Sequence, residues 1–201
     1  MSGIAIPAQD HTHIQVHFLY GSTPRKAYKD TERKWFGGRL GGHVGVELDS
    51  GRIVNFVPKG SYHVFARKKD LHGRWMVHAP RMFWQVLGNQ AEDVKKTTIT
   101  IPVTPSQWQA MDSLTKCYLD TTPYDYAFLG MRCAAATYDL LATGEVLPAW
   151  SYGKTWRKMF YPRKLRKRLL LLAREQGWPI RRDAGTERRK WERDVGRSRA
   201  P

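Results

Sequence analysis

The first hundred residues alternate apolar and polar positions in short runs, the pattern of half-buried β-strands. The tripeptide Asp49–Gly51 is typical of a tight turn between two such runs, and residues 24–40 are predicted to be a long loop. Pro102 indicates that the last strand lies at a sheet edge or ends there, because proline donates no hydrogen bond to a ladder. Strands are predicted over five segments: 14–20, 42–48, 52–57, 62–65 and 97–103.

The apolar spacing changes to a helical period after residue 103. Thr104 is a suitable N-cap, Pro105 suits the first helical position, and Gln107 completes a capping box. A helix is therefore predicted from this point to the break at residues 121–124. Cys117 falls on or beside the apolar face of this helix, which predicts a small buried hydrophobic residue.

Two further helices are predicted from composition. Residues 133–141 are rich in alanine, and residues 163–174 form a basic amphipathic segment, whereas residues 181–201 are predicted to be disordered. Together with the strands, these helices predict an α+β fold with a small antiparallel sheet packed against the alanine-rich helix. Residues 1–150 are long enough to form one domain, and residues 151–201 are predicted to be a basic C-terminal extension.

The charge of the chain is high and unevenly distributed. The net charge is +16, and residues 151–201 hold 17 of the 34 Lys and Arg but only 5 of the 18 Asp and Glu. A segment this basic predicts an anionic partner, either nucleic acid or an anionic membrane surface, with a solvated extension as the alternative. Aromatic and leucine residues among these basic residues are compatible with both partners.

The remaining composition excludes several classes of protein. Two cysteines do not make a disulfide framework, and no stretch is long and apolar enough to span a bilayer. No secretory signal is recognised near the first residues, so a cytoplasmic location is expected unless a dedicated system exports the protein. His11 and His13 lack an accompanying carboxylate or thiol cluster, so no metal or other cofactor is predicted.

The chemistry of the chain is predicted to depend on one cysteine and one histidine. Cys133 opens the alanine-rich helix, and His43 begins a predicted strand after paired glycines. A thiol becomes a nucleophile when a base and a positive electrostatic environment act on it, which an imidazole and a helix N-terminus supply. Cys133 would then ionise below the ordinary thiol pKa of about 8.5.

The hairpin geometry adds a third candidate residue. If Leu48 pairs with Arg52, strand alternation places His43 and Asn55 as diagonal neighbours on one face, about 7–8 Å apart at the backbone. Asn55 could then hold the imidazole in its working tautomer. Glu47 shares this face but lies about 13 Å along the strand from His43, too far for contact.

These two segments resemble a known family. Gly42–Asn55 resembles the histidine hairpin of the NlpC-type papain-like cysteine hydrolases, and Pro123–Tyr126 followed by Cys133 resembles their nucleophile helix. Because histidine precedes cysteine, the order is similar to the circularly permuted branch, which includes the lecithin retinol acyltransferase-like proteins. The resemblance covers roughly residues 14–145. It implies a nucleophile, a base and a third polar residue at Cys133, His43 and Asn55, with Tyr124 and Gly42 lining the oxyanion or substrate site.

Two functions follow from this interpretation. The first is a cysteine-dependent hydrolase or acyltransferase that acts on an amide or ester, either a peptidoglycan-type peptide or a lipid acyl group, with residues 1–150 as the catalytic domain. The alternative is a catalytically inactive binding protein whose segment 151–201 contacts nucleic acid or an anionic membrane. The chain pattern alone gives no oligomeric state.

Overall fold

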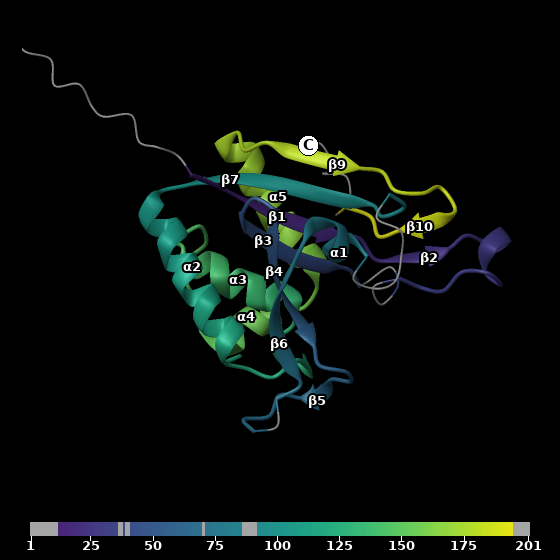
Figure 1. Ribbon diagram of the computed structural model, residues 1–201. Coiled ribbons are helices and arrows are strands. Elements are labelled where there is room, and N and C mark those ends of the chain that lie inside the picture. Colours follow the sequence, from purple (N-terminus) through teal and green to yellow (C-terminus); the bar gives the residue numbers. More distant parts are fainter. Residues whose placement is uncertain (1–11, 36–37, 39–40, 70, 86–91, 195–201) are drawn as a thin grey trace, which may run out of the picture.

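A six-stranded antiparallel sheet organises the protein (Figure 1). The computed structural model describes residues 12–35, 38, 41–69, 71–85 and 92–194. The strand order is β6-β4-β3-β1-β7-β9, so the first strand of the chain lies in the interior of the sheet. The strands are β1 (Thr12–Leu19), β3 (His43–Asp49), β4 (Arg52–Pro58), β6 (Gly73–His78), β7 (Lys96–Val103) and β9 (Ile180–Asp183).

Helices cover the sheet, and two short ribbons extend it. The helices are α1 (Pro80–Trp84), α2 (Pro105–Asp120), α3 (Cys133–Thr143), α4 (Tyr152–Lys158) and α5 (Pro162–Gln176), with a 3-10 turn, η1, at Lys26–Tyr28. In one ribbon β2 (Ser22–Pro24) pairs with β10 (Arg189–Trp191), and in the other β5 (His63–Phe65) runs parallel to β8 (Ala127–Leu129). The α+β class predicted from the sequence is therefore confirmed.

The alanine content of α3 explains its central position. Its first turns are buried, and Ala134, Ala135 and Ala136 pack in the main core with Val44 and Val46 of β3. Small side chains let the helix approach the sheet closely, and the close fit maximises dispersion contacts. The sheet thus holds the N-terminus of α3, where Cys133 lies, against the beginning of β3.

The local sequence signals before residue 150 mostly match the structure. The predicted strands and the helix that begins after Thr104 are present, and the Thr104–Gln107 capping box forms as expected. Pro102 lies within β7, which pairs with β1 along its whole length and with β9 only as far as Ile99; the Thr100 N–H donates on the β9 side, and the nitrogen of Pro102 faces the same side, beyond the end of that pairing. The missing N–H of Pro102 therefore costs no ladder hydrogen bond.

The prediction for Cys117 is wrong. Cys117 is exposed on α2, whereas Met111 and Thr115 form the buried side of that helix. The apolar stripe of α2 is narrow, because Trp108, Leu114 and Tyr118 are only partly buried against the core. A one-residue rotation about the helix axis, about 100°, is enough to move a position from the core to solvent.

The prediction of disorder from residue 181 is also wrong for the residues that the structure describes. β9 completes the main sheet by pairing with β7, and β10 pairs with β2. Residues 195–201 lie outside the described residues. Within the described residues, α5, β9 and β10 all contact elements of residues 1–150, while the division of the chain at residue 150 stays a prediction.

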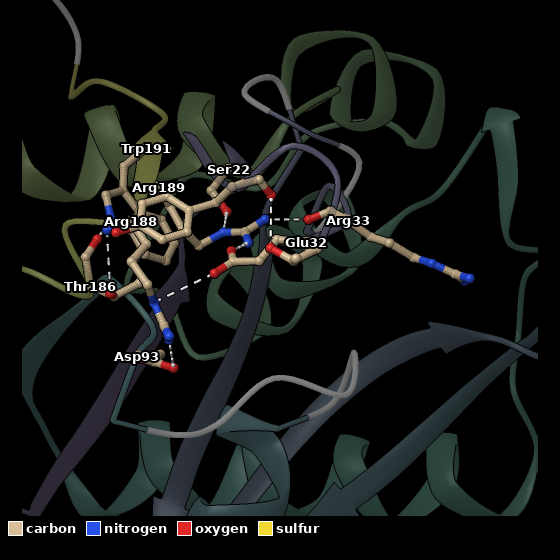
Figure 2. A network of polar contacts seen from close by, with 10 residues as sticks. Ser22, Glu32, Arg33, Asp93, Thr186, Arg188, Arg189 and Trp191 are labelled. Atoms are coloured by element: carbon tan, nitrogen blue, oxygen red, sulfur yellow. Dashed lines mark hydrogen bonds and ion pairs between the residues drawn. The ribbon is translucent and has the colours of Figure 1, made fainter. Parts of the chain in front are cut away.

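Two buried arginines explain why this basic segment folds. Arg189 donates to Ser22, Glu32 and the carbonyl of Arg33, and its guanidinium stacks 3.7 Å from the Trp35 ring (Figure 2). Arg166 of α5 is also buried and pairs with Glu192 at 3.0 Å. Charge that looks solvated in the sequence is thus partly satisfied inside the protein, which composition alone does not show.

The described helices include none with both the length and the apolar composition needed to cross a bilayer. In α5, Leu169 and Leu170 are buried, Leu171 is exposed and Leu172 is partly buried, and Leu165 and Leu169 belong to the main core. The apolar face of this helix is therefore used to pack on the protein.

Candidate active site

The hairpin β3–β4 brings His43 and Asn55 together. Its register, in which Val46 faces Val54 and Glu47 faces Ile53, is the one predicted, although a bulge near the turn pairs Asp49 instead of Leu48 with Arg52. His43 Nε2 lies 2.9 Å from Asn55 Oδ1, and both residues are buried. The register thus positions an imidazole and an amide as the sequence predicted.

Burial keeps His43 neutral. The loss of solvent lowers the pKa of His43 to about 4; the Asn55 hydrogen bond opposes this change and nearby His78 adds to it. The ring packs 5.5 Å from the Phe83 ring of α1. Because Asn55 accepts from Nε2–H, the lone pair of the neutral ring is on Nδ1, and no described residue hydrogen-bonds to that atom.

Cys133 lies at the first residue of α3 and is buried. Burial raises the pKa of its thiol, while the positive charge of Arg132, the Tyr126 hydroxyl and the backbone N–H groups of Ala134 and Val44 act in the opposite direction. The predicted low pKa is therefore not what the resting structure favours. At neutral pH, a neutral thiol lies close to several groups that would stabilise a thiolate.

Arg132 is held in place beside the thiol by aromatic rings. Its guanidinium lies 3.7 Å from the centre of the Phe160 ring and donates to the Phe160 carbonyl. The rings of Phe128 and Tyr161 lie 5.4 and 5.3 Å from the same group. A cation fixed by stacking at the start of a helix adds to the positive potential of the helix N-terminus.

The thiol and the imidazole both lie near the beginning of β3, but they do not contact each other. The backbone N–H of Val44, the residue after His43, acts on the Cys133 thiol, but no hydrogen bond joins Cys133 to His43 within the described part of the chain. Val44 points into the main core with Cys133, whereas His43 packs on Phe83 of α1. Since successive residues of a strand point to opposite faces, the side chains of the candidate base and the candidate nucleophile lie on opposite faces of β3 at rest.

The two weaker candidates, Tyr124 and Gly42, have different surroundings. Tyr124 is in the apolar core, edge-on to the rings of Phe56 and Tyr118. Gly42 has a φ of 106°, and a side chain there would collide with the Leu19 carbonyl. The backbone at this position therefore requires glycine.

Sequence reasoning did not identify three residues of the site, Tyr126, Arg132 and His78. Tyr126 is two positions from Tyr124, and only the observed path of the chain distinguishes the tyrosine that reaches the thiol. Arg132 precedes the cysteine directly and was visible as a cation next to a helix start. His78 lies in the segment 66–92, for which no element was predicted, so no signal placed it near Asn55.

Within the ranges that the structure describes, no group of three or more His, Cys, Asp and Glu side chains could hold a metal ion. His11 lies outside the described residues, and His13 is exposed on β1. Glu47, which shares the face of His43, accepts instead from His17 at 2.7 Å.

Comparisons with known proteins give limited information. No protein-family model matches the chain, and no curated protein matches it. A search of solved structures finds the crystal structure of a type VI secretion system effector, TseH, at 13% sequence identity and a TM-score of 0.44, covering 76% of this chain and 88% of that chain. A likeness at this level carries no argument about the fold, so the papain-like architecture and its permuted branch stay predictions.

Proposed function

We propose that the protein is a cysteine-dependent hydrolase or acyltransferase that acts on an amide or ester, with Cys133 as nucleophile, His43 as base and Asn55 as orienting residue. The observation that carries the proposal is the buried hydrogen bond between His43 Nε2 and Asn55 Oδ1, which leaves the Nδ1 lone pair free beside the strand position that contacts the thiol. A fixed tautomer with a free acceptor nitrogen is what a general base requires.

The proposed reaction uses the neutral forms of both groups. His43 Nδ1 takes the proton of Cys133 as Sγ attacks the carbonyl carbon, and the same proton passes to the leaving amine or alcohol when the carbon–heteroatom bond breaks. Water, or an acceptor hydroxyl or amine, then attacks the thioester and releases the thiol. Backbone N–H groups at the start of α3 are suited to hold the oxyanion.

The proposal requires movement of the His43 side chain. A general base acts within about 2.6–3.2 Å of the proton donor, and such contacts often tighten only when substrate is bound. Because His43 and Val44 are consecutive strand residues that point to opposite faces, the contact requires the start of β3, which pairs with β4 only from Val46 onward, to shift together with the His43 ring. The substrate is expected to be a peptide-like amide or an acyl ester, since both present the carbonyl that this chemistry needs.

Thiol labelling tests the proposal directly. In a Cys117→Ala background, which removes the exposed thiol, a small uncharged chloroacetamide should label Cys133, and His43→Ala should slow labelling about tenfold or more because the general base is lost. His13→Ala, on the exposed side of β1, is the matched control, and mass spectrometry gives the rates. Equal labelling rates in the His43 and His13 variants at unchanged melting temperature would reject the catalytic pair.

The exposed basic side chains favour a second candidate, an inactive protein that binds a polyanion. Lys164 and Lys167 are exposed on α5, and Arg181 and Arg182 are exposed on the edge strand β9. The binding protein would retain a single-stranded oligonucleotide at low salt, with a binding constant that falls steeply as salt is added.

Fluorescence anisotropy with a labelled oligonucleotide measures this affinity. The double variant Lys164→Glu/Lys167→Glu should weaken binding and reduce its dependence on salt. Each lost phosphate contact makes the slope of the logarithm of the binding constant against the logarithm of the salt concentration shallower by about 0.7 for a single strand. Cys133→Ser is the control that should bind unchanged. Absence of binding at low ionic strength, or binding only to anionic vesicles, would exclude nucleic acid as the partner.

A further inference from the structure

A second histidine, His78, lies on the far side of Asn55 from His43. His78 is the last residue of β6, is buried, and faces Ile53 of β4 in the sheet register. Its Nδ1 lies 3.0 Å from Asn55 Nδ2, while Asn55 Oδ1 lies 2.9 Å from His43 Nε2. The three side chains form a buried row, His43–Asn55–His78, that crosses three neighbouring strands.

The orientation of the Asn55 amide decides which nitrogen of His43 carries the proton. With Oδ1 toward His43, the Nε2 atom must bear the hydrogen and Nδ1 keeps its lone pair. With the amide rotated by 180°, the NH2 group would face Nε2, the proton would move to Nδ1, and no lone pair would remain for the thiol. The orientation of the Asn55 amide therefore decides whether His43 has a basic nitrogen at Nδ1.

The acceptors around Nδ2 fix this orientation. His78 Nδ1 is the nearest at 3.0 Å, and the carbonyls of Ile53 and Met76 lie at 3.4 and 3.3 Å. A rotated amide would place Oδ1 against the two carbonyls, and against His78 Nδ1 when that nitrogen carries no hydrogen, which is unfavourable in a buried site. His78 makes the shortest of the three contacts, and it holds this orientation as long as its own hydrogen is on Nε2.

The surroundings of His78 favour an unprotonated ring. Burial lowers the pKa of His78, and the positive charge of Arg74 on the same strand lowers it further. The neutral ring of His43 lies beyond Asn55, and none of the described residues places a carboxylate in hydrogen-bonding contact with His78. With its hydrogen on Nε2, His78 presents Nδ1 as an acceptor to Asn55.

We propose that His78 is a positioning residue that accepts a hydrogen bond from Asn55, fixes the orientation of the Asn55 amide, and so keeps the His43 proton on Nε2. This inference rests on the proposed function only for its catalytic consequence. The tautomer of His43 is a property of the folded protein whether or not the protein is an enzyme.

Nitrogen NMR of histidine-labelled protein reads this tautomer directly. In the Cys117→Ala background, His43 should be protonated on Nε2, and His78→Phe, which keeps a ring but removes the acceptor, should give a mixture that contains the Nδ1–H form. His78→Gln restores an acceptor and should restore the single tautomer. Chloroacetamide labelling of Cys133 should fall about threefold to tenfold in His78→Phe, the change that one net hydrogen bond makes to an equilibrium.

Replacing Asn55 itself gives a sharper control. A carboxylate at position 55 has no donor end, so in Asn55→Asp the His43 tautomer should no longer depend on residue 78. The double variant Asn55→Asp/His78→Phe should therefore match Asn55→Asp in its nitrogen spectrum. If the phenylalanine variant does not fold, His78→Leu takes its place in both comparisons.

The outcomes separate the two proposals. An unchanged His43 tautomer in folded His78→Phe would overturn the role of His78. A changed tautomer together with a Cys133 labelling rate that is insensitive to His43→Ala would support the positioning role of His78 and reject the enzyme.

Discussion

Replacing Arg166 with methionine is expected to destabilise the protein by about 3–5 kcal/mol, the cost of leaving a buried carboxylate without its partner. The Arg166 side chain is 1% exposed, and that of its partner Glu192 is 0% exposed. The guanidinium also donates to Asp194 at 3.0 Å and stacks 3.8 Å from the Tyr20 ring. Removal of this one side chain therefore takes away the ion pairs that join Glu192 and Asp194 to α5, while Tyr20 still donates to Asp194.

Urea denaturation at neutral pH measures this effect. Lys167→Met on the same helix is the matched control: its side chain is exposed, and its change in unfolding free energy should stay within about 0.5 kcal/mol. The double variant Arg166→Met/Glu192→Met should recover most of the loss, because a buried ion pair replaced by apolar groups is often neutral. A loss for Arg166→Met no larger than for Lys167→Met would show that the ion pairs of Arg166 with Glu192 and Asp194 do not stabilise the fold.

Local sequence signals were sufficient wherever one segment determines its own structure. The capping box at Thr104–Gln107 and the hairpin around Asp49–Gly51 are such cases, and the register of that hairpin was enough to predict the contact between His43 and Asn55. The bulge at the turn displaced only the last pair. Strand alternation transmitted the register correctly over the remaining residues.

Features that depend on distant segments were not predictable in the same way. The strands β9 and β10 contain arginine where strands usually contain apolar residues, and they form only because β7 and β2 offer edges for pairing. Arg166 and Arg189 resemble solvated residues until the positions of Glu192 and Glu32 are known. The same limitation applies to the site, where Tyr126 and His78 approach through tertiary contacts.

The separation of Cys133 and His43 also follows from tertiary packing. Both residues lie at the beginnings of their elements, as the sequence indicated, but Val44 and Cys133 share the main core while the His43 ring packs on Phe83. The sequence could not place Phe83, because α1 is a single short turn without a helical period. An imidazole that packs on an aromatic ring and a thiol buried at the start of a helix are both shielded from solvent in this structure.

Lowering the pH from above 6.5 to about 4 is expected to reduce the free energy of unfolding by about 3 kcal/mol through the protonation of His43 in the unfolded chain. The pKa of this histidine falls from 6.5 to about 4 on folding, and each pKa unit corresponds to about 1.36 kcal/mol. Between these two values the unfolded chain binds the proton and the folded protein does not. Stability is therefore full above pH 6.5, falls as the pH drops toward about 4, and loses nothing more through this group below that value.

Comparison with His43→Gln isolates this contribution, because glutamine can still donate to Asn55 but does not titrate. Urea midpoints at several pH values between 7.5 and 4 should show a shallower acid loss in His43→Gln than in the unsubstituted protein, whereas His13→Gln should leave the slope unchanged. Other buried groups titrate with different signs: burial lowers the pKa of His78 and raises that of Glu192. These contributions are common to both proteins and cancel in the difference. Parallel curves of urea midpoint against pH for His43→Gln and the unsubstituted chain would mean that His43 is solvated or already charged in the fold. A neutral, buried His43 is what the proposed base requires, because only the unprotonated ring can take a proton from Cys133.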